Sequence, residues 1–319
     1  MDIDWRTAIE NAASLGFASR PAAGDDRRLR DGRVYPMVHP KFKLEAGCSI
    51  FTIGSCFARH LEEKLEDFDL PTRGFAAPKE EWPHRPNGLL NEFNPGSMYQ
   101  RIVKACTSTS FSDADLIPVT NSVLDLLLRA TIPVPHERAL LRRAEIDSVY
   151  RALVTSDAVV ITLGLVETWF DQETGLYLNQ MPPLGVLRSH PQRFCLRILD
   201  VDESYRMLSE AIDRLLNTSE CRILLTVSPV PMQATFSGED LHIANSFSKS
   251  VLRICASRAS RQFERVDYFP SFEIVMSGGL DSFDDDNVHV RNDVVESVVG
   301  FMRQNYVRAS SERPVQSAG

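Results

Sequence analysis

Short apolar runs recur along the chain and predict the strands of a buried sheet. They are CSIFTIG (48–54), DAVVITLG (157–164) and RILLTVSPVP (222–231). The second run has a continuous apolar centre, which is typical of a strand covered on both faces of a parallel sheet. A further strand is expected within RVDYFPSFEIV (265–275), where Pro270 interrupts the pattern.

Apolar residues at helical spacing fill the intervals between these runs. They predict helices in SCFARHLEEKLEDF (55–68), VDESYRMLSEAIDRLL (201–216), GEDLHIANSFSKSVLRICASRA (238–259) and NDVVESVVGFMRQNYV (292–307). Repeated alternation of strand and helix, with no strand-rich block, favours a doubly wound, mostly parallel sheet with helices on both faces. The expected fold class is therefore α/β, in three α/β/α layers.

Three segments fall outside this alternation. Residues 1–44 predict an N-terminal arm with one short helix, which is expected to wrap the main domain of residues 45–307. Residues 76–150 are rich in Pro, Asn and Arg and are expected to form an inserted helical segment or lid. Residues 308–319 are polar and are expected to be disordered.

The charge balance argues against two classes of partner. Lys and Arg number 35 against 43 Asp and Glu, giving a net charge of −8. Binding to nucleic acid or to an anionic membrane surface needs a basic excess. With 43% hydrophobic and 24% charged residues, the composition is that of a globular protein rather than a disordered or fibrous one.

Metal, cofactor and membrane motifs are missing from the sequence. The six cysteines include no CxxC pair, and no Walker A, GxGxxG or HExxH motif occurs, so no metal or cofactor is expected. The first residues, MDIDWRTAIENAASLG, are acidic and polar, unlike a signal peptide. The longest apolar stretch, residues 158–166, is far shorter than the ~20 residues that span a bilayer. These features predict a cytoplasmic protein.

Ser55 occupies the turn between the first strand and its helix. A serine there places its hydroxyl at the carboxyl edge of the sheet, and its own N–H lies where unpaired helix donors can stabilise an oxyanion. Ser55 is therefore a candidate nucleophile, and N-capping of the helix is the alternative. Cys56 is a rival nucleophile, because a helix N-terminus lowers the pKa of a thiol, but we expect it to face the packed side of the helix.

Asp286 and His289 form a D-x-x-H motif near the other end of the chain. This spacing lets the carboxylate bind Nδ1 of the imidazole and fix its tautomer, which leaves Nε2 free to act as a base. We then expect Ser55 Oγ and His289 Nε2 within hydrogen-bond reach, or one water apart. The alternatives are a solvated acidic surface run, DSFDDD (281–286), or a calcium loop, although the EF-hand pattern is missing.

Several separate blocks resemble the GSCFA family, which takes its name from the pentapeptide found here at residues 54–58. The blocks are IGSCFARHLEEKL (53–65), VVITLGLVETWFD (159–171), LLTVSPVP (224–231), NSFSKSVLR (245–253), YFPSFEIV (268–275) and the D-x-x-H. The family is itself similar to the SGNH/GDSL hydrolases. The resemblance, over roughly residues 48–305, implies their fold, with Ser55 as nucleophile, His289 as base and Asp286 as its orienter.

The oxyanion hole departs from the pattern that the resemblance implies. An SGNH enzyme offers a glycine and an asparagine, the latter in a G-x-N-D block, but the corresponding loop here reads GLVE (164–167). We expect the Ser55 N–H as one donor and Asn94, or the N–H of Gly96, as the second; turn formation before Pro95 is the alternative for Asn94. The candidate oxyanion and substrate-binding residues are Gly54, Asn94, Gly96, Gly164, Glu167 and Trp169.

Some residues near these motifs have two interpretations. Glu167, expected in a loop after the second strand, binds a substrate hydroxyl or pairs with a neighbour such as Arg59. Trp169 stacks on a sugar ring or is half-buried in the core. Lys249 meets an acidic group or, by default, is solvated. The segment 228–231 is expected to shape the strand exit and to do no chemistry.

The resemblance implies a serine enzyme for acyl transfer at an oxygen ester, through an acyl-Ser55 intermediate. The expected activity is that of an esterase or O-acyltransferase. Its partners would be a small-molecule or glycan substrate and, for a transferase, an activated acyl donor. The alternative is a catalytically weak glycan- or ligand-binding module on the same scaffold. The acyl group and the oligomeric state stay open.

Overall fold

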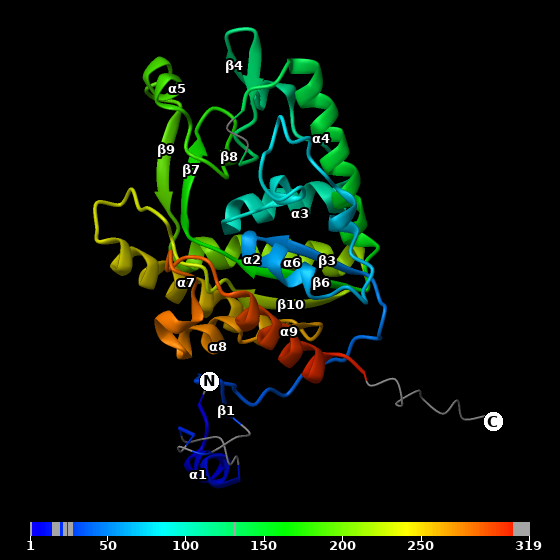
Figure 1. Ribbon diagram of the computed structural model, residues 1–319, viewed down its shortest axis with the longest axis vertical. Helices are drawn as coiled ribbons and strands as arrows, with labels where there is room; N and C mark the ends of the chain where they lie inside the picture. The colour runs from blue at the N-terminus through cyan, green and yellow to red at the C-terminus, as the bar shows by residue number, and fades with distance from the viewer. Residues whose placement is uncertain (1, 15–19, 22–23, 25–27, 130–131, 309–319) are drawn as a thin grey trace, which may run out of the picture.

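A four-stranded parallel sheet forms the centre of the molecule (Figure 1). The computed structural model describes residues 2–14, 20–21, 24, 28–129 and 132–308. The strands of this sheet are β3 (Ile50–Gly54), β6 (Ala158–Leu163), β10 (Arg222–Val227) and β11 (Val266–Tyr268). Their order is β11-β10-β6-β3, and every neighbouring pair is parallel. The carboxyl ends of the strands therefore meet at one edge, as the sequence predicts.

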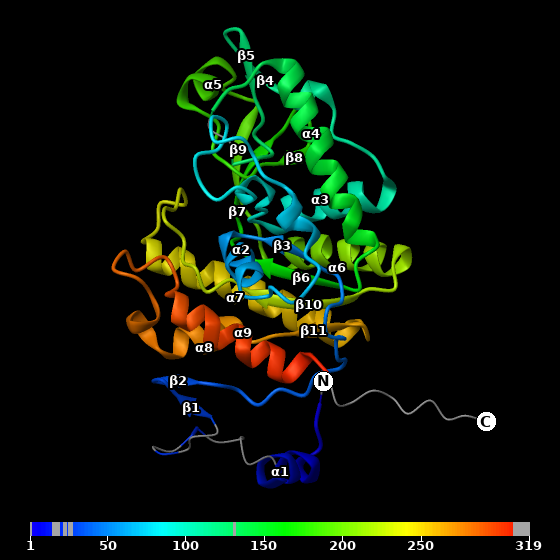
Figure 2. The same cartoon turned by 45° about the vertical axis from the view of Figure 1, so that its right-hand side comes forward.

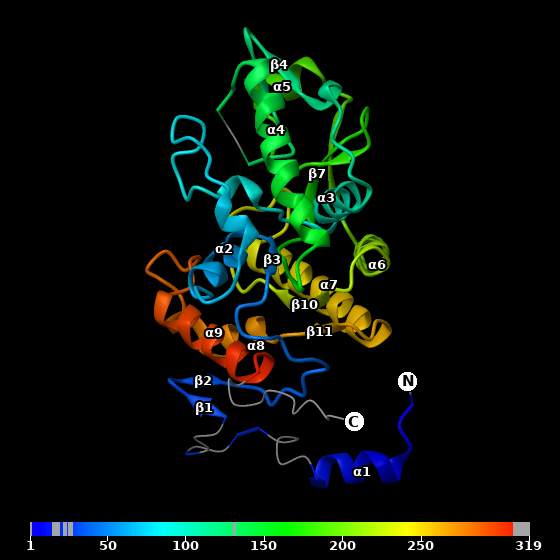
Figure 3. The same cartoon turned by 90° about the vertical axis from the view of Figure 1, so that its right-hand side faces the viewer.

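Helices cover both faces of this sheet, so the expected three-layer fold class is confirmed. One face carries α3 (Pro95–Thr107), α4 (His136–Tyr150), α6 (Val201–Thr218) and α7 (Leu241–Gln262), and the other carries α2 (Cys56–Glu63), α8 (Ser271–Ser277) and α9 (Asn292–Tyr306). Alternate strand residues divide between the two hydrophobic clusters: Phe51 and Ile161 pack on the α6 side, and Ile50 and Val160 on the α9 side. Figure 3 shows α2 and α9 on one side of the sheet and α6 on the other.

Pro270 divides the segment that was expected to form one strand. The strand β11 ends at Tyr268, and residues 271–277 form α8. Proline has no N–H for the ladder, and its fixed φ suits the residues that lead into a helix. The prediction of a strand was therefore correct only for the part that precedes Pro270.

A second, antiparallel sheet follows β6, in residues that were expected to form a loop. Its strands are β7 (Glu167–Asp171), β8 (Leu176–Tyr177) and β9 (Phe194–Ile198), in the order β8-β7-β9. The sequence was expected to contain no strand-rich block, and this was wrong. The pattern missed β7 because the strand is short and has an acidic residue at each end, a residue type that is depleted in strands. Glu167 and Trp169 therefore lie on a strand rather than in a loop.

Residues 76–150 pack against this second sheet as well as against the central one. Besides α3 and α4 they contain the hairpin of β4 (Ile117–Val119) and β5 (Ser122–Leu124). Leu124 shares a hydrophobic cluster with Phe194, whereas Ile102 belongs to the cluster on the central sheet. The remaining short elements here and nearby are α5 (Leu184–Ser189) and the 3₁₀ helices Pro71–Gly74, Gly88–Leu90, Asp113–Asp115, Arg151–Val154 and Gly279–Ser282.

The described part of the N-terminal arm contains α1 (Trp5–Ser14) and a hairpin of β1 (Leu29–Arg30) and β2 (Arg33–Val34). Figure 2 shows the hairpin beside α8 and α9. The backbone N–H of Val34 donates to Ser277 Oγ at 2.8 Å, and that of Leu44 to the Tyr306 carbonyl at 2.6 Å. The arm thus runs along one layer of the domain. The tail expected to be disordered, beyond residue 308, lies outside the described residues.

A buried ion pair fixes α2, the helix that follows Ser55. Arg59 and Glu62 are each 1% exposed, and their side chains approach to 2.6 Å. The Glu62 carboxylate also accepts hydrogen bonds from Thr72 and Asn87, at 2.7 and 2.8 Å. Both charges are buried, so each one needs the other as its counter-charge to offset the cost of desolvation.

We predict that Glu62→Gln lowers the free energy of unfolding by roughly 3–5 kcal/mol, because it leaves the Arg59 charge buried without a counter-charge. Urea unfolding followed by tryptophan fluorescence measures the change. Glu63→Gln is the matched control, since Glu63 is 47% exposed in its pair with Arg85 and should cost less than ~1 kcal/mol. Equal stability of the two variants would contradict this role of the buried pair.

Candidate active site

Gly54 ends β3 in a conformation that only glycine adopts readily. Its φ is +150°, and a Cβ there would lie 2.5 Å from the Thr162 carbonyl oxygen. Ser55 follows as the N-cap residue of α2, but its side chain makes no capping hydrogen bond. The Ser55 side chain therefore does not cap α2, and its hydroxyl is free to bind another group.

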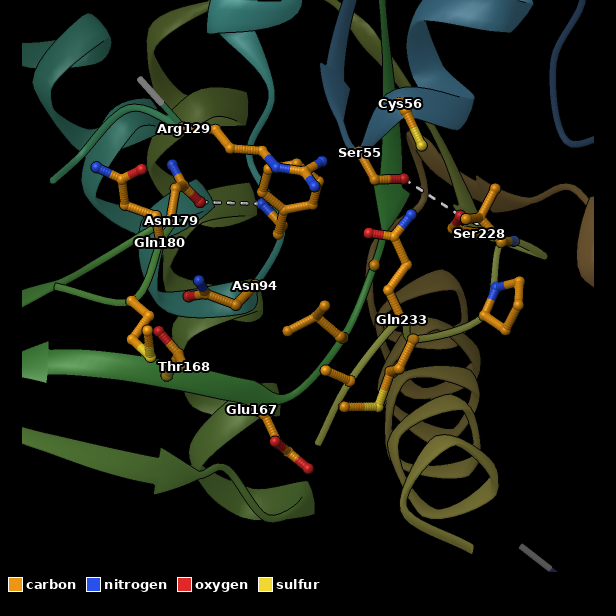
Figure 4. A pocket seen from close by; sticks show the side chains of 18 of the residues that line it. Ser55, Cys56, Asn94, Arg129, Glu167, Thr168, Asn179, Gln180, Ser228 and Gln233 are labelled. Atoms are coloured by element: carbon orange, nitrogen blue, oxygen red, sulfur yellow. Dashed lines mark hydrogen bonds between the residues drawn. The ribbon is translucent and has the colours of Figure 1, made fainter. Parts of the chain in front are cut away.

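The Ser55 hydroxyl donates to Ser228 Oγ at 3.2 Å, as Figure 4 shows. Both serines are buried and line a cavity of about 280 Å³ at the carboxyl edge of the sheet. Ser228 Oγ also accepts from the Val230 N–H at 3.3 Å. Sequence reasoning gave the 228–231 segment no chemistry, although Ser228 directly follows a parallel strand, which is the same signal that pointed to Ser55.

Cys56 also lines the cavity, so the expectation that it faces the packed side of the helix was wrong. Burial raises the pKa of the Cys56 thiol, and the nearby charges of Arg129, Arg85 and Lys249 only partly oppose this. The expected lowering by the helix N-terminus is thus outweighed by desolvation. A thiol with a raised pKa is a poor source of thiolate at neutral pH, which disfavours Cys56 as the nucleophile.

The Asp286–His289 motif forms the pair that its spacing predicts. Asp286 Oδ2 lies 2.5 Å from His289 Nδ1, and Oδ1 accepts the backbone N–H groups of Val288 and His289, both at 2.9 Å. The hydrogen bond from His289 is the first of the causes that lower the pKa of Asp286 to about 2. The carboxylate therefore stays ionised and holds the imidazole by its Nδ1 edge.

His289 reaches the cavity that contains Ser55, since Val288 and His289 both belong to its wall. The imidazole is 47% exposed there. The Ser55 hydroxyl is hydrogen-bonded to Ser228 rather than to His289. The structure thus brings Ser55 and His289 to one cavity and Asp286 to the Nδ1 side of His289, while a direct contact between Ser55 and His289 stays a prediction.

Gly164 is fixed by hydrogen bonds on both of its sides. The Leu163 carbonyl accepts from the Ser228 N–H at 2.8 Å, and the Leu165 N–H donates to the Phe93 carbonyl at 2.9 Å. A Cβ on Gly164 would lie 2.5 Å from that same Phe93 oxygen. Within the described residues, no hydrogen bond uses the backbone N–H of Gly164 or of Ser55. Both residues line the cavity, so two backbone donors there are available to a ligand.

Asn94 lines the cavity, but its side chain is committed elsewhere. It is the N-cap of α3, where its Oδ1 accepts the Ser97 N–H at 2.8 Å and its Nδ2 donates to the Leu178 carbonyl at 3.2 Å. Gly96 lies against the Tyr177 ring, which a Cβ would approach to 2.2 Å. The Asn94 side chain therefore serves the start of α3, and the second oxyanion donor expected from Asn94 or Gly96 stays a prediction.

Glu167 projects from the start of β7 and lines the cavity. Its carboxylate accepts hydrogen bonds from the Thr235 hydroxyl and, at 3.0 Å, from the Phe236 N–H. The expected alternative of a pair with Arg59 was wrong, because Arg59 is bound to Glu62. Glu167 instead joins the second sheet to residues 235–236.

Trp169 is half-buried in the cavity wall, and its ring meets the ring of Phe236 edge-on at 5.7 Å. Apolar side chains continue this part of the wall: Leu165, Leu178, Met181, Leu196 and Met232. The cavity wall therefore combines polar groups with apolar side chains, a combination typical of small-molecule sites.

Lys249 is a second residue whose importance sequence reasoning missed. It was expected to be solvated, but it is 4% exposed and lines the cavity. Its Nζ donates to the carbonyl oxygens of Gly164 and Val230, at 2.7 and 2.8 Å. No local signal in the sequence marks this burial, because the two carbonyl groups lie 85 and 19 positions away from Lys249.

Two searches of the described part of the chain gave negative results. No group of three or more His, Cys, Asp and Glu residues is placed there to hold a metal ion. No described helix is long and apolar enough to cross a bilayer.

Ser55, at a strand-to-helix turn of a three-layer α/β domain, and His289, which is bound to Asp286, line one cavity. The chain belongs to the GSCFA family, whose sequence profile matches residues 49–301. No curated protein matches the chain.

Solved structures to which the chain is similar include esterases and a lipase. A variant of an acetyl-xylooligosaccharide esterase from Geobacillus has a TM-score of 0.36 and 13% identity, over 84% of this chain and all (100%) of the other. A putative GDSL-like lipase from Parabacteroides merdae has a TM-score of 0.37 and 12% identity, over 84% and 99%. A carbohydrate esterase family 2 enzyme from Corynascus has a TM-score of 0.33 and 14% identity, over 86% and 68%. These overlaps are loose, so function has to be argued from the chain's own residues.

We predict that Cys56 is alkylated slowly at neutral pH, because burial keeps its pKa above the ~8.5 of a free thiol. Iodoacetamide labelling from pH 6 to 10, resolved by peptide mass spectrometry, measures the rate at this residue. The rate at Cys56 should still rise with pH where the rate for a short unstructured cysteine peptide in the same tube has levelled off. A plateau for Cys56 below pH 8 would restore it as a candidate nucleophile.

Proposed function

We propose that this protein is a serine esterase or O-acyltransferase that acts on oxygen esters through an acyl-Ser55 intermediate. The observation that carries the proposal is the Ser55 turn itself. The hydroxyl makes no capping bond, it opens into a cavity, and its N–H makes no hydrogen bond with the described residues. Helix capping, the common structural use of such a serine, does not account for this arrangement.

In the proposed mechanism, the Ser55 hydroxyl turns from Ser228 toward His289, whose Nε2 takes its proton. Asp286 holds the Nδ1–H and stabilises the imidazolium that forms. Ser55 Oγ adds to the ester carbonyl, and the resulting oxyanion accepts hydrogen bonds from the N–H groups of Ser55 and Gly164. Collapse breaks the ester C–O bond, and His289 returns the proton to the leaving alcohol.

The second half of the reaction repeats these steps with a different acceptor. Water attacks the acyl-Ser55 carbonyl in an esterase, and a sugar hydroxyl attacks it in an O-acyltransferase, where an activated acyl donor has loaded the serine. His289 takes the proton of the acceptor and returns it to Ser55 Oγ as the acyl bond breaks. The same groups therefore serve both activities, and only access of the acceptor distinguishes them.

We propose an ester on a carbohydrate as the substrate class. Trp169 contributes an aromatic ring to the cavity wall, and Glu167, two residues earlier on β7, contributes a carboxylate as an acceptor for a substrate hydroxyl. Gln180 and Gln233 also line the cavity with polar side chains. Aromatic rings combined with carboxylate and amide groups can bind the apolar face and the hydroxyls of a sugar.

The second candidate is a ligand-binding module without turnover. It is favoured by one observation, the hydrogen bond of the Ser55 hydroxyl to Ser228 in place of His289. Such a protein would keep the cavity for a glycan while its serine stays unreactive. The two candidates differ in whether the protein hydrolyses a simple acetyl ester.

We predict that Ser55→Ala lowers kcat/KM for p-nitrophenyl acetate by at least ~10³-fold, because it removes the nucleophile. The free energy of unfolding should change by less than ~0.5 kcal/mol, since Ser55 makes no cap bond. Cys56→Ala tests the rival nucleophile and should keep its turnover. If Cys56→Ala lost activity while Ser55→Ala stayed fully active, the nucleophile would be Cys56 and not Ser55. Wild-type turnover no faster than background would favour the binding module.

We predict that Asp286→Asn lowers kcat on the order of 10³-fold, because the amide no longer holds the imidazole in the required tautomer. Stability should be nearly unchanged, since the pair is exposed to solvent. Asp285→Asn, one residue away in the same exposed acidic run, is the matched control. Equal kcat values for the two variants in a p-nitrophenyl acetate assay would show that Asp286 takes no part in the reaction.

A further inference from the structure

Lys249 is a buried cation whose hydrogen bonds go to carbonyl oxygens. It lies on α7, is 4% exposed, and binds the backbone of Gly164 and Val230 through Nζ. Among the described residues, no carboxylate forms an ion pair with it. An ammonium group buried without a counter-charge is costly to the folded protein. A neutral residue would fill the same space at less cost, so the position calls for a functional explanation.

The two carbonyl groups that bind Lys249 belong to the loops after β6 and β10. In the first loop, Gly164 lines the cavity, and its N–H has no hydrogen-bond partner among the described residues. In the second, the Val230 N–H donates to the oxygen of Ser228, which accepts the hydrogen bond of Ser55. One nitrogen therefore joins the candidate oxyanion donor to the turn that holds the nucleophile.

We propose that Lys249 is a positioning residue, which fixes the Gly164 N–H and the Ser228–Val230 turn relative to Ser55. This inference rests on the proposed function and extends it to a side chain that touches neither the substrate nor the reacting atoms.

Glycine makes this anchoring necessary. Gly164 has no side chain to limit its backbone, so its N–H would otherwise sample several directions. Three hydrogen bonds fix the adjacent peptides, and they involve Ser228, Phe93 and Lys249. The Lys249 bond is the only one of the three made by a side chain, so a substitution can remove it without changing the backbone of the sheet.

The charge on Lys249 adds a pH dependence to this anchoring. Burial lowers the pKa of its ammonium group to about 7, and among neighbouring groups the Cys56 thiol opposes the shift. The other titratable or charged side chains of the cavity wall are Arg129, Glu167 and His289. Below pH 7 the ammonium makes charge-assisted hydrogen bonds and adds positive charge beside the oxyanion, whereas above pH 7 the neutral amine binds the carbonyls more weakly.

The test compares Lys249→Met and Lys249→Arg with wild type and with Arg261→Met, an exposed position near the end of the same helix. In a p-nitrophenyl acetate assay from pH 5.5 to 9, the ratio of wild-type kcat to Lys249→Met kcat should fall as the pH rises through about 7. Taking the ratio removes the pH dependence of the His289 base, which both proteins share. Lys249→Met should lower kcat on the order of 10²-fold at pH 6 with KM within about twofold, because a misdirected donor is felt mainly in the transition state. Lys249→Arg should regain part of kcat, and the ratio of its kcat to that of Lys249→Met should not fall above pH 7.

Amide hydrogen exchange gives a readout that does not require turnover. Peptides covering residues 163–166 and 228–231 should exchange at least about fivefold faster in Lys249→Met than in wild type or Arg261→Met. Unchanged exchange in both loops of the folded variant would overturn the proposal. So would a wild-type kcat in Lys249→Met, or a ratio of the two kcat values that does not change with pH. If wild type showed no turnover but Lys249→Met exchanged faster, the anchoring role of Lys249 would be supported and the proposed enzymatic function would be wrong.

Discussion

At the end of β3 the backbone of Gly54 comes so close to Thr162 that no side chain fits between them. A Cβ would lie 2.5 Å from the Thr162 oxygen, and the φ of +150° excludes most other residues in any case. This conformation turns the chain out of the parallel ladder within one residue. Ser55 then starts α2 and lines the cavity. Its N–H forms no hydrogen bond with any described residue. The buried Arg59–Glu62 pair holds the helix that follows.

The rest of the site depends on strands that end at the same edge of the sheet. Ser55, Gly164 and Ser228 each follow a parallel strand, and this topology brings together loops that lie far apart in the sequence. Lys249, from α7, then binds two of these loops through one nitrogen. His289 enters from the loop before α9, held by Asp286. The sheet supplies the positions, and the helices and loops supply the groups that could react.

Local patterns in the sequence predicted the parts of this arrangement that depend on neighbouring residues. The central strands follow from continuous apolar runs, and the Asp286–His289 pair follows from its spacing. The pattern could not find the bond from Asn94 Nδ2 to the Leu178 carbonyl, which lies 84 positions away in the sequence. Nor could it find the burial of Lys249, because that depends on loops more than eighty positions and about twenty positions away. Long-range packing decided these cases, and local spacing carries no information about it.

The central claim is that Ser55 is an activated nucleophile, and covalent trapping tests it most directly. The folded protein is treated with a fluorophosphonate, and the adduct is located by intact mass and peptide mapping. The account predicts one adduct per chain, on Ser55, formed by the native protein and not after thermal unfolding. No adduct on the native chain, or an adduct on Cys56 or on a serine outside the cavity, would contradict it.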